Sequence, residues 1–174
     1  MKTWKLAAIF MALVSVLTFS SCGSDDEPRC VANTQWEKVF NPAEYEAWNK
    51  GSDFKFRDFD LEEAILTEAS IKLDFISKTQ ATFIHKEAYE GGYFVQIKYL
   101  IPFDYNTTTG AVMLKFSDRE SLAIEHNLPD GADQGIDPVL YVNSLGQVDW
   151  DKNTLSLTLV DEEVGTHPVI LTKK

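Results

Sequence analysis

The stretch from Gly92 to Phe116 constrains the fold more than any other part of the chain. Its first half alternates, and one set of alternate positions is wholly apolar: Tyr93, Val95, Ile97, Tyr99, Ile101 and Phe103. A period of two predicts a strand buried on one side. Turn residues at 106–110 interrupt the pattern, and Val112, Leu114 and Phe116 resume it. We therefore predict a long β-hairpin at the centre of an antiparallel sheet.

Shorter segments of the same kind flank this hairpin. Alternation and turn signals predict strands at 35–40, 71–75, 81–86, 120–126, 139–142, 147–150, 154–159 and 164–174, with turns at 77–79, 90–92 and 144–146. Pro168 marks the last strand as an edge or a strand opening. Roughly eight to ten short strands joined by close turns favour an all-β fold, a small antiparallel up-and-down barrel.

Helix signals are confined to the region near the N-terminus. Asn41 fits an N-cap, Pro42 fits the first helical turn, and Glu44 completes a capping pattern, so a short helix is predicted over 42–50. Tyr45 and Trp48 share one face of that helix, and we expect them to pack on the domain. Residues 54–59 suggest a brief extended piece, and 60–69 fit either a second helix or a strand.

Residues 1–21 read as a signal peptide. Lys2 and Lys5 precede an apolar run over 6–19 that is too short to span a bilayer comfortably, and Phe19-Ser20-Ser21 leads directly to Cys22. This order resembles a bacterial lipoprotein signal, which implies cleavage before Cys22 and a diacylglycerol on its thiol. A disulfide between Cys22 and Cys30 is the alternative. With Cys22 acylated, Cys30 is left as a free thiol.

The acidic run Asp25-Asp26-Glu27 follows Cys22 closely. It fits a solvated linker, and it also resembles the surface-export signal of Bacteroidetes lipoproteins. The second interpretation implies an outer-membrane protein that faces the cell exterior and contacts the membrane through acylated Cys22. The formal charge of −11 becomes −13 without Lys2 and Lys5, which disfavours a nucleic-acid partner.

A lipidated cysteine, an early Trp36 in the segment NTQW, meander strands and the late segment DKNTLSLTL together resemble lipocalin-like lipoproteins of Bacteroidetes. The resemblance implies a signal peptide at 1–21, a linker at 22–33 and a β-barrel domain at 34–174. It also implies a barrel that either holds a small apolar ligand or is filled by its own side chains.

Candidate chemistry is sparse. His85 and Glu87 share one face of a predicted strand and could form an acid–base pair, although a hydrogen-bonded histidine at the barrel rim is the ordinary alternative. The segment 130–137 carries three carboxylates and two glycines, and could bind calcium or form an acidic turn. The sequence shows no P-loop, G-x-S-x-G or zinc-ligand spacing. We assign no catalytic residue, metal ligand or cofactor.

The sequence therefore favours a non-enzymatic binding or accessory module with a small apolar ligand or a surface protein partner. The inward aromatic residues Tyr93, Tyr99, Phe103 and Phe116 would fill the barrel or line a pocket. Two alternatives remain open. One is a glycan-active hydrolase that uses paired carboxylates. The other is an assembly component of an outer-membrane complex, which would expose an apolar patch.

Overall fold

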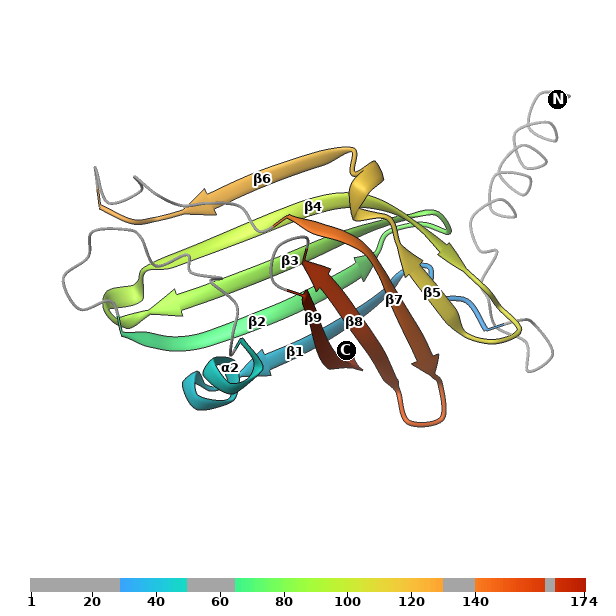
Figure 1. The fold of residues 1–174 in the computed structure, drawn as a ribbon, viewed down its shortest axis with the longest axis horizontal. Coiled ribbons are helices and arrows are strands. Elements are labelled where there is room, and N and C mark those ends of the chain that lie inside the picture. The colour runs from blue at the N-terminus through green and yellow to red at the C-terminus, as the bar shows by residue number, and fades with distance from the viewer. Residues whose placement is uncertain (1–28, 50–64, 130–139, 162–164) are drawn as a thin grey trace, which may run out of the picture.

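The computed structural model describes residues 29–49, 65–129, 140–161 and 165–174. The described residues form an all-β protein built around a closed antiparallel barrel of eight strands (Figure 1). The strands are β1 (Thr34–Phe40), β2 (Leu66–Phe75), β3 (Gln80–Tyr89), β4 (Phe94–Tyr105), β5 (Ala111–Leu114), β6 (Ser121–His126), β7 (Tyr141–Asp149), β8 (Thr154–Asp161) and β9 (Gly165–Lys173).

Chain order and barrel order agree, as the close turns predict. The ring runs β1-β2-β3-β4-β5-β7-β8-β9 and returns to β1. β6 stands outside this ring and pairs with β4. The β1–β9 seam that closes the ring is short, with register pairs at Trp36↔Lys173 and Glu37↔Thr172. The predicted all-β, up-and-down barrel is confirmed.

The central strand is β4, but the predicted hairpin is shorter than expected. β4 pairs with β5 at Phe103↔Leu114, Asp104↔Met113 and Tyr105↔Val112, while an earlier part of the same edge pairs with β6. The chain leaves the strand after Leu114 and enters a 3₁₀ turn, η3 (Phe116–Asp118). Phe116 is still fully buried. Its place in the alternation therefore reflects burial and not strand geometry.

The predicted turn at 144–146 is wrong, because β7 runs unbroken from Tyr141 to Asp149 with a β-bulge between Val142 and Leu145. Ser144 supplies hydrogen bonds to backbone groups at the bulge. Its Oγ donates to the Val142 carbonyl at 2.9 Å and accepts from the Val160 N–H at 3.1 Å. Gly146 sits where an added Cβ would lie 3.1 Å from the Ser156 carbonyl oxygen. Ser144 therefore bonds the backbone of the bulge, and Gly146 allows close approach of β8, so neither residue marks a turn.

A single α-helix, α2 (Pro42–Trp48), occurs in the described residues. The predicted capping box is present, because the Asn41 side chain accepts from the Glu44 N–H at 3.0 Å and the Glu44 carboxylate accepts from the Asn41 N–H at 3.2 Å. The helix ends at Trp48 with Asn49 as its C-cap, short of the predicted residue 50. The extended piece predicted at 54–59 lies outside the described residues, and Leu66–Ala69 belong to β2.

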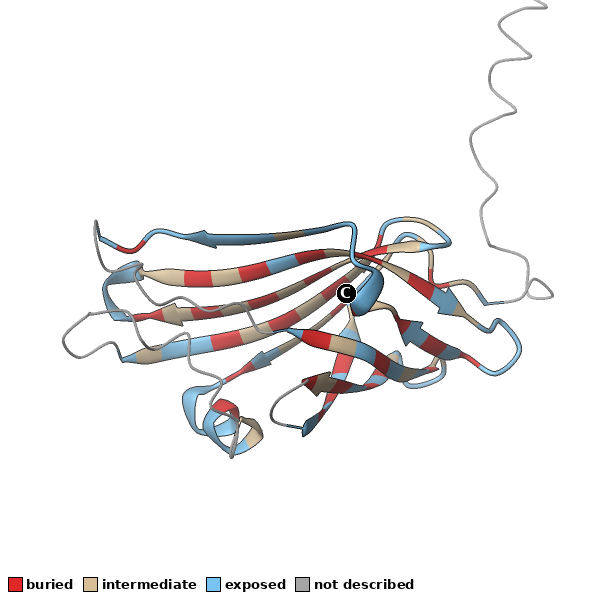
Figure 2. Cartoon of the chain, turned by 45° about the horizontal axis from the view of Figure 1, so that its top comes forward, coloured by how far each residue is buried: buried red, intermediate tan, exposed pale blue. Residues whose placement is uncertain are grey.

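The inner face of the barrel is apolar and aromatic along most of its length. Buried and less buried positions alternate along β2, β3 and β4 (Figure 2). Four rings, Phe83, Tyr99, Phe116 and Tyr141, meet with centroid distances between 5.1 and 6.2 Å. Of the predicted inward aromatic residues, Tyr99, Phe103 and Phe116 are buried, whereas Tyr93 is half-buried. Aromatic side chains therefore fill the middle of the barrel.

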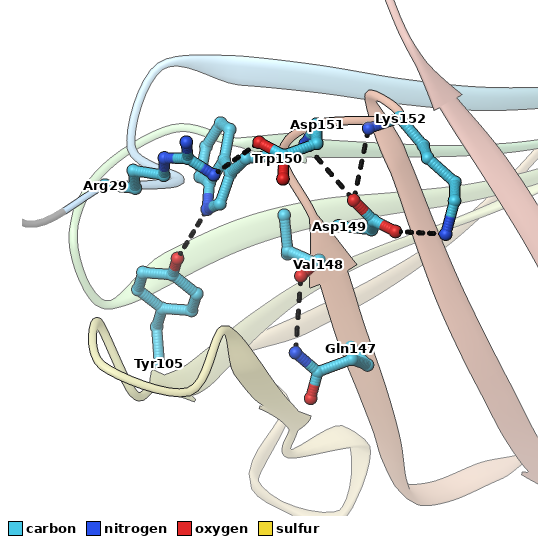
Figure 3. A network of polar contacts seen from close by, with 8 residues as sticks. All are labelled: Arg29, Tyr105, Gln147, Val148, Asp149, Trp150, Asp151 and Lys152. Carbon is cyan, nitrogen blue, oxygen red and sulfur yellow. Dashed lines mark hydrogen bonds and ion pairs between the residues drawn. The ribbon is translucent and has the colours of Figure 1, made fainter.

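The end of the barrel where β1 begins is also packed. The buried Trp36 ring meets Trp150 edge-on, with centroids 5.9 Å apart. Figure 3 shows how Trp150 is held: its indole N–H donates to the Tyr105 hydroxyl at 3.1 Å, beside the Arg29–Asp151 ion pair. Trp36 and Trp150 therefore close this end of the barrel.

Candidate functional site at the α2 end of the barrel

The opposite end, where β3 finishes and helix α2 lies, carries buried polar side chains. We call Tyr45, His85, Glu87, Tyr89 and Tyr141 the polar layer. His85 and Glu87 point inward because they continue the inner-face alternation of β3, and they are 0% and 2% exposed. The other three come from α2, the end of β3 and the start of β7. The layer thus joins three elements that are distant in sequence.

Hydrogen bonds connect these side chains into a directed chain. The Tyr45 hydroxyl donates to Glu87 Oε1 at 2.6 Å and lies 2.8 Å from His85 Nε2. Because its one proton goes to Glu87, the Tyr45 oxygen accepts from His85 Nε2–H. His85 Nδ1 then accepts from the Tyr141 hydroxyl at 3.2 Å. Tyr89 donates to the second oxygen of Glu87. The chain therefore assigns the Nε2–H tautomer to His85.

Burial keeps His85 neutral. Desolvation first, and then the nearby imidazole of His167, lower the pKa of His85 to about 3. A neutral imidazole donates at one nitrogen and accepts at the other, as the hydrogen-bond chain requires. The environment therefore opposes a positive charge at this end of the barrel.

The tyrosines stay protonated for a related reason. Desolvation raises the pKa of Tyr45 well above its ordinary value, and the charge of Glu87 raises it further. Desolvation likewise raises the pKa of Tyr141, with smaller contributions from Tyr99 and from Asp161, which is opposite Tyr141 in the β7–β8 register. Both hydroxyls therefore act as donors and not as phenolate bases.

His167 lies beside this layer on the inner face of β9. It is 6% exposed, and its Nε2 atom is buried without a hydrogen-bond partner. The Trp48 ring packs against it with centroids 5.2 Å apart. The Trp48 indole N–H in turn donates to the Pro168 carbonyl at 2.8 Å, which ties α2 to β9 beyond the short β1–β9 seam.

The inner wall continues past the polar layer onto β6. Register places His85, Ile97 and Ile124 in one row across β3, β4 and β6, and Glu87, Val95 and His126 in the next. Ile97 and Val95 are fully buried, but Ile124 is 38% exposed and His126 is also exposed. Accessible inner-wall surface therefore adjoins the buried polar groups.

The sequence anticipated part of this site. His85 and Glu87 are brought together, with Tyr45 hydrogen-bonded to both, and Tyr45 and Trp48 pack on the domain as expected. Cys22 and the 130–137 segment lie outside the described residues. Cys30 is a half-buried free thiol. Sequence reasoning did not place Tyr89, Tyr141 or His167 at the site, although all three continue inward alternations of their strands.

The layer is suited to hydrogen bonding more than to metal or acid–base chemistry. In the ranges that the structure describes, no three His, Cys, Asp or Glu side chains gather as a metal ion would need. No helix in those ranges is long and apolar enough to cross a membrane. Glu87 accepts from two tyrosines, so the proposed His85–Glu87 acid–base pair is instead a pair joined through the Tyr45 hydroxyl.

The fold and this site define an eight-stranded antiparallel barrel, compatible with a lipocalin-like architecture, that has a packed middle and a polar layer at one end. Comparison of the chain with family models, with curated proteins and with solved structures gives no match in any of the three.

A second concave surface lies outside the barrel. A groove of about 600 Å³ crosses the outer face of β7, β8 and β9, and none of its lining residues is charged: Leu145, Gly146, Gln147, Ser156, Leu157, Thr158, Pro168, Val169 and Ile170. Leu145 and Ile170 are 64% and 60% exposed. An uncharged and partly apolar groove therefore lies on the exterior of an acidic chain.

Proposed function

We propose that the chain is a lipocalin-like lipoprotein of the outer membrane, anchored through acylated Cys22 and facing the cell exterior, that acts as a non-enzymatic binding module. The α2 end of the barrel is its binding site. The observation that carries this proposal is the accessible inner wall of β6, with Ile124 38% exposed in the same row as buried His85. Small-molecule sites usually combine apolar wall residues with a few polar groups that point toward the same place.

The packed middle of the barrel supports a site at its end. Phe83, Tyr99, Phe116 and Tyr141 occupy the centre, so a ligand has no room to pass deep into the barrel without displacing them. A ligand held above these rings meets the polar layer on one side and β6 on the other.

The anchoring part of the proposal rests on the sequence. The order of Lys2 and Lys5, the apolar run over 6–19 and the small residues before Cys22 supports export and lipidation. Labelled palmitate should enter the wild-type protein and not the Cys22→Ser variant. Protease added to intact cells should remove the domain if it faces the exterior.

The binding part is tested by native mass spectrometry of protein extracted from its own membranes. We expect a small molecule to be retained and then lost on denaturation. A protein mass without any retained molecule, across several gentle detergents, argues against a binding module.

The outer groove on β7, β8 and β9 favours a second candidate function, that of an assembly component of an outer-membrane complex. Leu145 and Ile170 expose apolar surface on an uncharged face of an acidic chain. Crosslinking in intact cells from position 145, with Lys98 on the exposed outer face of β4 as the matched control position, tests it. A defined crosslinked partner from 145 alone supports this role.

The hydrolase alternative is less well supported by the geometry. Such an enzyme needs a carboxylic acid and a carboxylate that both reach substrate. Glu87 is 2% exposed and accepts hydrogen bonds from Tyr45 and Tyr89. Release of reducing sugar from glycans, abolished by Glu87→Gln, would establish the hydrolase instead.

A further inference from the structure

The His167 side of the α2 end differs from the rest of the site. The polar layer satisfies its own groups through Tyr45 and Tyr141, whereas His167 Nε2 is buried with no partner. An unpartnered buried nitrogen is destabilising, and native proteins keep few such groups. The half-buried Trp48 ring, which also packs on Phe40 and Tyr45, lies with its centroid 5.2 Å from that of the His167 ring.

We propose that the ligand of this site is an uncharged molecule with a planar ring and a hydroxyl group, and that the hydroxyl bonds His167 Nε2 while the ring packs against Trp48. This inference rests on the proposed function and specifies the chemical class of the ligand. A hydroxyl both donates and accepts, so it matches either tautomer of His167.

Burial opposes ionised ligands at this site. Glu87 and Asp161 are buried carboxylates on the same inner face, and an anion would be repelled by them and would lose its hydration. A cation would be attracted by these carboxylates but would also lose its hydration, and desolvation is the main reason that the pKa of His85 is lowered to about 3. A neutral ligand avoids both costs.

Access past Trp48 requires the hydrogen bond of its indole to open. Trp48 is the last residue of α2, it is half-buried, and its indole N–H donates to the Pro168 carbonyl at the protein surface. β9 is not paired with β1 at Pro168, because the β1–β9 register covers Trp36↔Lys173 and Glu37↔Thr172. Among the residues that the structure describes, movement of the Trp48 indole uncovers one side of the His167 ring and leaves the β1–β9 pairing intact.

Three probes that share one ring and differ in charge test the class: benzyl alcohol, benzoate and benzylamine, each added to the full lipidated protein in nanodiscs at pH 7. The readout is the ¹⁵N NMR signal of the side chains of the three histidines. We expect benzyl alcohol to shift the His167 signal in a saturable manner, with the two charged probes binding about tenfold more weakly. The indole ¹⁵N signal of Trp150, at the opposite end of the barrel, serves as the internal control.

Two variants keep the test independent of a single substitution. His167→Phe should abolish the benzyl alcohol response in thermal shift, and Trp48→Leu should weaken it, whereas Lys98→Ala, on the exposed outer face of β4, should leave it unchanged. Tighter binding of benzoate or benzylamine overturns the ligand class while leaving a binding module in place. Failure of every probe to move the His167 signal overturns the inference, and retention of a native ligand in mass spectrometry then still decides the proposed function separately.

Discussion

The Tyr45 hydroxyl lies 2.8 Å from Nε2 of His85, and this contact joins a seven-residue helix to the inner face of the third strand. The same hydroxyl donates to Glu87. One side chain therefore satisfies two polar groups that β3 buries, and it fixes the position of α2 at the end of the barrel.

Tyr45→Phe should lower the free energy of unfolding by about 2–3 kcal/mol, because it removes two buried hydrogen bonds, one to the imidazole of His85 and one to the carboxylate of Glu87. Urea unfolding measures this. Tyr93→Phe is the matched control, since Tyr93 is half-buried outside the polar layer, and it should change stability by less than about 0.5 kcal/mol. Equal effects of the two substitutions would contradict the role given to Tyr45.

Stability should fall as the pH drops below about 6.5. His85 has a pKa of about 3 in the folded protein, whereas an unfolded histidine takes up a proton near pH 6.5. Between these values the unfolded state binds more protons, so the loss from His85 approaches about 1.4 kcal/mol per pH unit. Urea unfolding at pH 7, 6 and 5 measures the slope. His85→Gln should flatten it, and an unchanged slope in that variant would assign the effect to other groups.

Asn41→Ala should destabilise the protein by about 1 kcal/mol, because it removes the side chain that caps α2. The consequence extends to the site, since α2 carries Tyr45 and Trp48. Amide hydrogen exchange should quicken in 42–48 and leave the β8–β9 pair unaffected. Glu46→Ala, on the exposed face of the same helix, is the control. Uniform acceleration across all strands would show that the cap supports the whole fold and not α2 alone.

Gly110→Ala should cost more than Gly92→Ala. Both glycines have positive φ, +76° and +82°, so each substitution carries a backbone cost of about 1 kcal/mol. At Gly110 an added Cβ would also lie 2.8 Å from the Val148 carbonyl oxygen, whereas at Gly92 it meets nothing within 4 Å. Thermal unfolding of the two variants gives the difference, which reports how tightly the β4–β5 turn packs on β7. Equal melting temperatures would contradict that close contact.

The sequence predicts the barrel well because alternation, turns and caps are local signals. The capping box at Asn41 and the inward set of β4 are both as expected. The site is harder to foresee, since it depends on register between distant strands. His167 and Tyr141 look like ordinary strand residues until β9 and β7 close the ring beside β3. The turn prediction at 144–146 was wrong for a similar reason. Ser144 and Gly146 are typical turn residues, but in the fold both contact the backbone of β8, which the local sequence does not reveal.

The most direct test of the account is the free energy of unfolding of His167→Phe, measured in the absence of added ligand. If His167 Nε2 bonds a ligand, the ligand-free protein buries this nitrogen without a partner and is less stable for that reason. We predict that the variant is more stable than the wild type by about 1 kcal/mol, because phenylalanine keeps the ring against Trp48 and removes the unsatisfied nitrogen. A loss of 2 kcal/mol or more, as for an ordinary core substitution, would show that His167 is a packing residue and would contradict the binding site at this end of the barrel.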